Sequence, residues 1–413
     1  MLTKRERYTP NDVGPSPLDW KTPRLAQVCE FISNGFVGTA SPFYADSTGV
    51  PYLYGCNVRP NKIDLKGTRY VTHAFHLKES KTALTPGDLL TVQSGHIGET
   101  AVVPDDLEIA NCHALIITRL NKSLVHPPFL SQYLNSEIGK ARLKGLEVGS
   151  TILHINTKDL KKFKLLLPPI EEQKKIAEIL SIWDEAISTT DQLYKNLRQQ
   201  KKILAGQLLN SKRRLSDFSN TWKSKPVPDC LIGSTLRNSK LSRFSIKDVM
   251  SVNKAEGMIP MRSETIGKSI ERYKIVRKGW FAYNPMRINT GSICRWQKDN
   301  DCLVSPDYIV FYCNEDVLLG SYFDQFRQSE RWADYMSNAG NGSVRVRIYL
   351  KDLERLEIPL PSLEEQEKIV HILETADHEI DAIKQNLVSL KVEKKALMQQ
   401  LLTGKLRVKV ETQ

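Results

Sequence analysis

A fourteen-residue segment occurs twice in this chain of 413 residues, and this repeat constrains the fold more than any other feature. The segment LPPIEEQKKIAEIL begins at Leu167, LPSLEEQEKIVHIL begins at Leu360, and nine of the fourteen positions are identical. The match extends without a gap from Gly149 to Leu209 at an offset of 193, with 25 identities in 61 positions. The sequence therefore predicts an internal repeat with one copy in each half.

Each copy has the features of a long helix. Prolines at 168, 169 and 361 precede it, and two glutamates follow, where the helix dipole favours negative charge. Alternate steps of four and three residues from Ile176 or Ile369 then visit mostly apolar side chains, and this mean period of 3.5 is typical of coiled coils. Because neither helix can bury such a stripe alone, we expect the two copies to pair. The predicted helix-pair seam consists of Ile176, Leu180, Trp183, Ile187, Leu197, Leu204, Ile369, Leu373, Ile380, Leu387, Leu390 and Leu397.

Lys201 and Lys394 fall at the same interior step of the two copies. A polar residue inside a seam can fix register and orientation, but a lysine can also extend from the seam edge into solvent, and both interpretations stay open here. A helix of about 35–40 residues spans roughly 50–60 Å, and a turn of B-DNA about 34–36 Å. A pair of such helices could therefore hold two modules on the same face of a duplex, one turn of DNA or somewhat more apart.

The segments outside the helices alternate short apolar runs with turn residues, as expected of strands. Each contains an amphipathic stretch, and Phe129, Leu130 and Tyr133 in the first match Tyr322, Phe323 and Phe326 in the second. We predict an α+β protein in which two similar domains are separated by two long helices that pair as an antiparallel coiled coil, a pseudo-two-fold internal repeat. The predicted parts are an N-terminal domain (1–166), a central helix (167–212), a C-terminal domain (213–359), and a C-terminal helix with a tail (360–413).

The composition is that of an ordinary soluble protein, with 40% hydrophobic and 26% charged residues. We expect a cytoplasmic protein without membrane contact, because no apolar run reaches the length of a membrane span and the first residues are polar. Seven cysteines are scattered without a CxxC pair, so we expect reduced core thiols and no metal site.

The net charge of +12 favours a polyanion as partner, and its distribution is more informative. Residues 240–300 carry 13 basic against 5 acidic side chains, whereas the helices are neutral or acidic. Polar loops in both domains offer Arg, Asn, Gln, Ser and His, which can bind base edges in a DNA groove. The candidate DNA-binding residues are Asn57, Arg59, Gln93, Ser94, His96, Ser150, Thr151, Arg287, Asn289, Thr290, Asn341, Ser343 and Arg345.

The motifs of nucleic-acid enzymes are incomplete, so no catalytic residue is predicted. GKS at 267–269 lacks the first glycine of a P-loop, and NPMR at 284–287 lacks the second proline and the aromatic residue of an adenine methyltransferase motif. Glu172-Gln173-Lys174 and Glu393-Lys394-Lys395 fit the ExK of nucleases, but we expect both on solvated helix faces.

Two diverged domains, each followed by a helix that begins PPIEEQ or PSLEEQ and ends QLL, resemble the specificity subunit of type I restriction-modification enzymes over essentially the whole chain. The resemblance implies a non-catalytic subunit whose two target-recognition domains bind the halves of a bipartite, asymmetric site in double-stranded DNA, with the helices setting the gap. It also implies two methylation subunits, which use S-adenosylmethionine to modify adenine. Restriction subunits would complete the complex and use ATP and Mg, and this chain itself would hold no cofactor.

Two other classes of protein stay open. A stand-alone DNA methyltransferase or nuclease would show activity as a purified single chain. A coiled-coil adaptor that never touches DNA would bind no DNA even with its partners present, and the basic surplus at 240–300 would then have no purpose.

Overall fold

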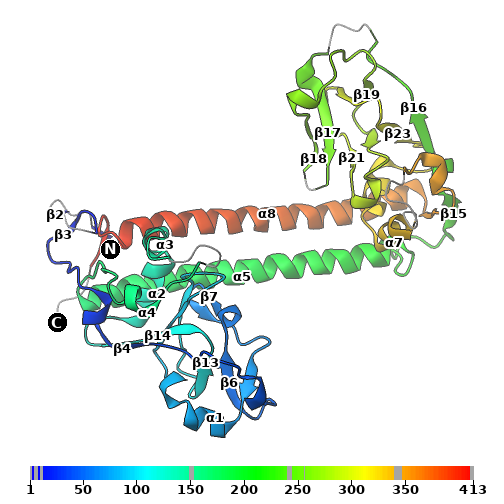
Figure 1. Ribbon diagram of the computed structural model, residues 1–413. Coiled ribbons are helices and arrows are strands. Elements are labelled where there is room, and N and C mark those ends of the chain that lie inside the picture. The colour runs from blue at the N-terminus through cyan, green and yellow to red at the C-terminus, as the bar shows by residue number, and fades with distance from the viewer. Residues whose placement is uncertain are drawn as a thin grey trace. The chain divides into compact units, whose positions relative to one another are not determined.

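The computed structural model describes residues 2–3, 8–9, 13–147, 153–239, 244–254, 256–338 and 347–409. Contacts divide the chain into unit 1, which comprises Met1–Thr190 and Asn386–Gln413, and unit 2, which comprises Asp191–Gln385. The helices α5 (Ile170–Leu209) and α8 (Leu363–Leu401) each contribute residues to both units (Figure 1). The predicted α+β class is confirmed. The four predicted domain ranges stay a prediction.

Unit 1 contains two main sheets. One is mixed, in the order β10 (Ala83–Leu84), β13 (Ala110–Cys112), β6 (Val50–Leu53), β9 (Arg69–Val71), β5 (Tyr44–Ala45). The other is antiparallel, in the order β12 (Thr100–Val102), β11 (Leu89–Val92), β14 (Leu115–Leu120), β4 (Cys29–Asn34). Three further strand pairs are β7 (Val58–Arg59) with β8 (Lys62–Ile63), β2 (Tyr8–Thr9) with β3 (Ser16–Pro17), and β1 (Leu2–Thr3) with β25 (Arg407–Val408). The shorter helices are α1 (His73–Lys78), α2 (Pro127–Asn135), α3 (Glu137–Lys144) and α4 (Thr157–Leu160).

Unit 2 repeats this plan. Its antiparallel sheet has the order β16 (Leu231–Ser234), β23 (Ile309–Cys313), β20 (Phe281–Tyr283), β21 (Ile293–Arg295). Its mixed sheet has the order β18 (Gly257–Pro260), β17 (Val249–Asn253), β22 (Cys302–Val304), β19 (Lys274–Val276). The strands β15 (Lys223–Pro226) and β24 (Glu357–Leu360) pair, and the shorter helices are α6 (Gly320–Phe326) and α7 (Glu330–Asn338). In each unit one strand pair of the mixed sheet is parallel, β13 with β6 and β22 with β17.

The helices α2 and α6 anchor each domain to the long helices. Phe129, Leu130 and Tyr133 of α2 are buried in the same core as Ile176 and Leu180 of α5. Their counterparts Tyr322, Phe323 and Phe326 of α6 are buried with Ile369 and Leu373 of α8. The match between the two amphipathic stretches therefore marks the helix that each domain packs on its long helix, where buried aromatic side chains contribute large contact areas.

The repeated EEQ triplet ties each long helix to its domain. Gln173, which is fully buried, donates to the Leu124 carbonyl at 3.0 Å and accepts from the His126 amide at 2.9 Å, just before α2. Gln366 makes the same two bonds before α6, with Val317 and Leu319, each at 2.9 Å. These bonds satisfy backbone groups near the helix starts that would otherwise lack partners.

The second glutamate of each triplet is buried. Glu172 and Glu365 are each only 1% exposed, whereas the preceding glutamates at 171 and 364 are exposed. The expectation of solvated faces at the two ExK segments was therefore wrong for Glu172 and for Lys394, because both side chains point into packed regions and form ion pairs. A buried carboxylate needs such a partner to offset its desolvation.

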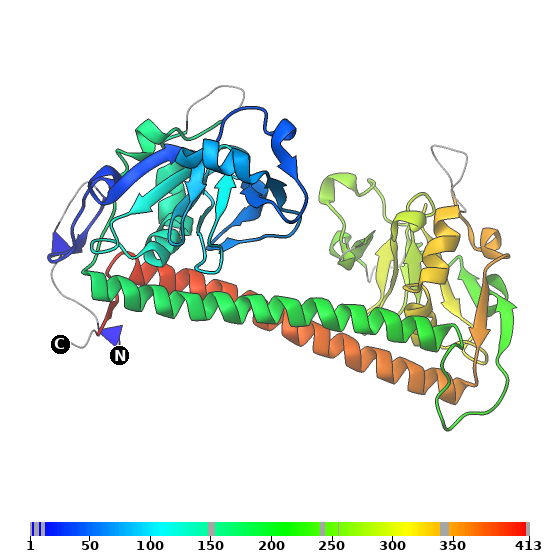
Figure 2. The same cartoon turned by 90° about the horizontal axis from the view of Figure 1, so that it is seen from below.

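Within each unit, α5 and α8 run antiparallel. In unit 1 the first half of α5 lies beside the second half of α8, and Ile176, Leu180 and Leu401 share one core. In unit 2 the second half of α5 lies beside the first half of α8, and Leu208 shares a core with Ile369 (Figure 2). Of the twelve predicted seam residues, five are buried (Ile176, Leu180, Ile369, Leu373, Leu387) and seven are half-buried (Trp183, Ile187, Leu197, Leu204, Ile380, Leu390, Leu397).

All seven cysteines are free thiols. Cys112, Cys230, Cys302 and Cys313 are buried and two others are half-buried, but Cys56 is exposed and is not a core residue. Among the described residues, no helix combines the length and the apolar character that crossing a membrane requires.

Candidate nucleic-acid interface

Two predicted loops of unit 1 arise from neighbouring strands. The first loop contains the 3-10 helix Gly55–Asn57 and leads into β7, which lies against β11 and β12. The second loop, which carries Gln93, Ser94 and His96, joins β11 to β12. Arg59, Ser94 and His96 are exposed on the two loops. Gln93 is half-buried, and its amide donates to the Asn34 side chain at 2.7 Å. Three of the predicted contacts are therefore free to reach a groove, and Gln93 is already held by the protein.

Asn57 has a different position from the one predicted. It is 2% exposed, its oxygen accepts from the Tyr54 amide at 2.9 Å, and its nitrogen donates to the Asp64 carbonyl at 2.9 Å and to Thr68 Oγ1 at 3.2 Å. The side chain joins the end of β6 to the turn before β9. We therefore leave Asn57 out of the proposed DNA contacts and assign it to the support of this turn.

The predicted loop of unit 2 is an anchored turn. Ile288 is buried, and the Arg287 carbonyl accepts from the Thr290 hydroxyl at 2.9 Å and from the Ser292 amide at 3.0 Å. Gly291 closes the turn with φ of +95°, a conformation that glycine adopts without strain. The side chains of Arg287, Asn289 and Thr290 are exposed on this turn. Three polar groups are thus presented together on a backbone that is already fixed.

Five of the candidate DNA-binding residues lie outside the described residues. They are Ser150, Thr151, Asn341, Ser343 and Arg345.

Sequence reasoning missed an arginine that the fold holds between two tyrosines. Arg69 on β9 is exposed, its Nη1 donates to the Tyr44 hydroxyl at 2.7 Å, and its guanidinium lies 5.0 Å from the ring centre of Tyr44 and 5.7 Å from that of Tyr54. The two phenol oxygens are 2.6 Å apart. No described carboxylate forms an ion pair with Arg69, so its charge is available to an anionic or guanine-bearing partner. No sequence signal links these residues, because the sheet brings them together from three strands or strand ends.

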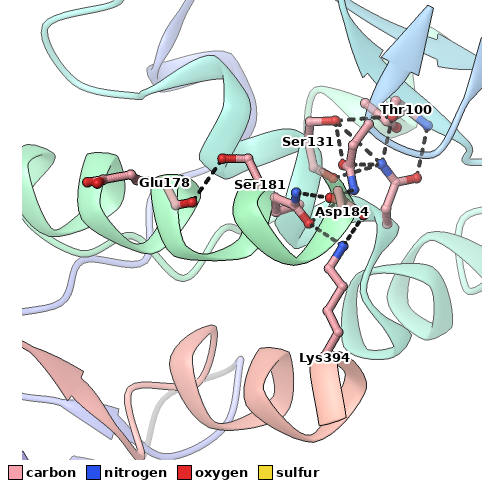
Figure 3. Close-up of polar contacts among 9 residues, drawn as sticks. Thr100, Ser131, Glu178, Ser181, Asp184 and Lys394 are labelled. Carbon is pink, nitrogen blue, oxygen red and sulfur yellow. Dashed lines mark hydrogen bonds and ion pairs between the residues drawn. The ribbon is translucent and has the colours of Figure 1, made fainter. Parts of the chain in front are cut away.

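A polar cluster connects the first domain to both long helices. Asn61, in the turn between β7 and β8, donates to Gln132 Oε1 at 3.0 Å and to Asp184 Oδ2 at 3.3 Å, and Gln132 donates to the same Asp184 oxygen at 2.6 Å. Lys394 of α8 donates to Asp184 Oδ1 at 2.5 Å (Figure 3). The turn that follows Arg59 is therefore held by side chains of α2 and α5, and Lys394 of α8 holds the Asp184 carboxylate to which Asn61 donates.

The cluster continues toward the sheet of unit 1. Ser131 and Asn135 of α2 both donate to Asn61 Oδ1, at 2.9 and 2.8 Å, and both also donate to the Thr100 carbonyl on β12 (Figure 3). Asn61 has a φ of +62°, which asparagine tolerates better than most residues. Such a connected network fixes one arrangement of its members.

Within the ranges that the structure describes, no three His, Cys, Asp or Glu side chains are grouped so that they could hold a metal ion.

Comparison with known proteins gives one consistent family. The family model for the type I restriction modification DNA specificity domain matches residues 17–199 and 298–392. The chain is 28% identical over 432 residues to the type I restriction enzyme MjaX specificity subunit of Methanocaldococcus jannaschii, with 98% of each chain covered. It is 26% identical over 299 residues to the MjaVIII specificity subunit of the same organism, covering 67% of this chain and 70% of that one.

Solved structures share the fold. The S subunit of a type I restriction-modification system from M. genitalium aligns with a TM-score of 0.57 at 15% identity, covering 92% of this chain and 96% of that one. A chain from a structure that describes complex assembly and conformational transition of the type I R-M system aligns with a TM-score of 0.53 at 17% identity, covering 94% and 99%.

Proposed function

This chain belongs to the type I restriction modification DNA specificity domain family, and we propose that it reads a bipartite, asymmetric DNA site with one half-site for each unit. It is a specificity subunit: it recognises DNA sequence and acts together with other subunits of a type I restriction-modification system. The observation that supports the bipartite interpretation is the duplication of one fold with different exposed residues. These are Arg59, Ser94 and His96 on two loops of unit 1, and Arg287, Asn289 and Thr290 on one turn of unit 2.

Each unit offers groups suited to the major groove of double-stranded DNA. Arginine can bind O6 and N7 of guanine with two hydrogen bonds, and asparagine can bind adenine in the same way. In unit 2 we assign this role to Arg287 and Asn289, because their side chains extend from a turn that is fixed before DNA binds. In unit 1 we assign it to Arg59 on β7, Arg69 on β9 and His96, with Ser94 in the same loop as His96. Gln93 would have to leave Asn34 to join them.

The long helices would set the distance between the half-sites and dock the partners. The same exposed residue types occupy equivalent positions at both helix starts. Glu171 corresponds to Glu364, and Lys175 corresponds to Lys368. Because the two starts present matching groups, they support the binding of two equivalent methylation subunits, with restriction subunits added in the full complex. S-adenosylmethionine would bind the methylation subunits, and ATP and Mg the restriction subunits, so that this chain supplies recognition and the adenine methylation and cleavage occur on other chains.

Methylome sequencing tests the proposal. Cells that express the chain with its methylation subunit should carry methyladenine at one split motif, and cells that lack only this chain should lose it. A methylome that is the same with and without the chain, in the presence of an active methylation subunit, would contradict the proposal.

A further inference from the structure

Two lysines inside the helix pair each have an aspartate partner on the opposite helix. The Lys394 side chain is 9% exposed, and its Nζ lies 2.5 Å from Asp184 Oδ1. The Lys201 side chain is 14% exposed, and its Nζ lies 2.5 and 2.6 Å from the two carboxylate oxygens of Asp377. Of the two interpretations that the sequence left open, these distances support a paired lysine over one that extends into solvent.

A glutamine from the adjacent domain completes each pair. Gln132 of α2 donates to Asp184 at 2.6 Å, and Gln325 of α6 approaches Asp377 at 3.4 Å. The lysines, the aspartates and the glutamines are each separated by the repeat offset of 193 residues. The same three-residue arrangement therefore occurs once in each unit, and in both it joins α5, α8 and the short helix of the domain.

Both ion pairs belong to one register of the antiparallel helices. In an antiparallel pair, opposite residues have numbers that add to a constant, and 184 with 394 gives the same total as 201 with 377. A slip by one heptad keeps the apolar seam in contact, so the seam alone does not distinguish the registers. The two lysines do.

A slip by one heptad in the first direction would place Lys394 opposite Ala177 and Lys201 opposite Val370. Both ammonium groups would then lie against apolar side chains without a carboxylate. A buried charge without a partner is strongly unfavourable, because the protein does not replace its lost hydration.

A slip in the other direction would bring Lys394 to Asp191, but it would also bring Lys201 to Lys384. Two like charges would then face each other across the helix pair. Of these three registers, only the observed one gives both lysines an aspartate.

We propose that the Lys201–Asp377 and Lys394–Asp184 pairs select this register and thereby make the gap between the half-sites a recognised part of the DNA site. The inference rests on the proposed function, in which the helices set the gap. The four charged residues are then specificity-determining positions that never touch a base. In unit 1 the pair also supports the turn after Arg59, because Asn61 donates to Asp184 at 3.3 Å.

The test uses the complete complex with its methylation subunits and a library of DNA sites in which both half-sites are constant and the gap varies by one base pair at a time. The double variant Lys201→Met with Lys394→Met replaces both lysines by apolar side chains of similar length. We expect its preference for the native gap over other gaps to fall by about tenfold or more, while both half-sites stay unchanged. Removing one partner of an ion pair lowers stability, but the remaining Asp184 and Asp377 side chains are 38% and 40% exposed and keep part of their hydration, so we expect the complex to stay folded with a lower melting temperature. The matched control, Lys195→Met with Lys391→Met, changes two exposed lysines of the same helices and should keep the gap preference.

A charge exchange provides the second arm. Asp184→Lys with Lys394→Asp restores an ion pair in the same register and should keep the native gap. A folded Lys201→Met, Lys394→Met complex with full gap preference would overturn the inference, and so would a folded charge-exchange complex that loses gap preference as far as the methionine variant does. If the unaltered complex methylates no split site at any gap, the proposed function itself fails, which is a different result from either of these.

Discussion

Arg407 binds Glu172 as Arg214 binds Glu365. Arg407 follows α8 and donates two hydrogen bonds to Glu172 in the first turn of α5, from Nε at 2.5 Å and from Nη2 at 2.6 Å. Arg214 follows α5 and donates two bonds of 3.0 Å to Glu365 in the first turn of α8. A tryptophan indole donates to each carboxylate as well, Trp20 at 3.1 Å and Trp222 at 3.0 Å. The start of each long helix is thus bound by the segment that follows the other helix. The internal repeat therefore includes a buried arginine–glutamate ion pair at both helix starts.

The Arg407→Ala substitution should destabilise unit 1. The Glu172 carboxylate is buried and would keep only the Trp20 indole as a partner, so we expect a loss of about 3–5 kcal/mol in the free energy of unfolding, the usual cost of breaking a buried ion pair. Denaturant unfolding measures it, with the exposed Lys405→Ala in the same tail as the control. A change no larger than that of the control would show that the pair does not stabilise the fold.

The Arg69→Ala substitution should relax one base position of one half-site. If the guanidinium between Tyr44 and Tyr54 reads a guanine, its removal should reduce DNA affinity by about 1–3 kcal/mol at that position only. The measurement is the DNA affinity of the variant for a set of sites in which each base is replaced in turn. The Lys78→Ala variant of the same domain is the control. Unchanged specificity at every base would exclude Arg69 from direct reading.

The Arg287→Ala substitution should act on the other half-site. The exposed guanidinium on a fixed turn is expected to contribute about 1–3 kcal/mol if it binds a guanine. A loss that is uniform across sequences, with the slope of the salt dependence reduced by about one, would instead identify a phosphate contact. Binding titrations at several salt concentrations separate the two outcomes.

Exchange of residues 20–163 for the same segment of a relative should change one half-site and leave the other intact. Most of the contacts of this segment lie within unit 1, which has its own sheets and cores. The methylated motif of the hybrid complex is the measurement. A change in both halves at once would contradict separate reading by the two units.

The helices could be predicted because periodicity is a local property, and the bounds at Ile170 and Leu363 follow the prolines that precede them. The role of the EEQ triplet could not be predicted in full. Favourable charge in the first turn explains Glu171, but the burial of Glu172 depends on Arg407, which is 235 residues away. The partners of Lys201 and Lys394 depend on the register, which the spacing of apolar residues leaves undetermined.

The reading loops were harder to predict. Composition identified the turn at Arg287, because Asn, Thr and Gly are typical of exposed turns. It gave the same signal for Asn57, but the side-chain amide of that residue is hydrogen-bonded to the backbone of Tyr54 and Asp64. For Arg69 composition gave no signal, because an isolated arginine in a strand becomes a candidate only when the sheet places Tyr44 and Tyr54 around it.

Lengthening both helices tests the central claim most directly. Seven residues that continue the heptad pattern would be inserted between Asp184 and Lys201 in α5, and seven more between Asp377 and Lys394 in α8. Both ion pairs and their common register are then kept, and each helix grows by about 10 Å, the length of about three base pairs. Methylome sequencing should find both half-sites unchanged and the gap longer by about three base pairs. An unchanged gap in an active, folded complex would contradict the account.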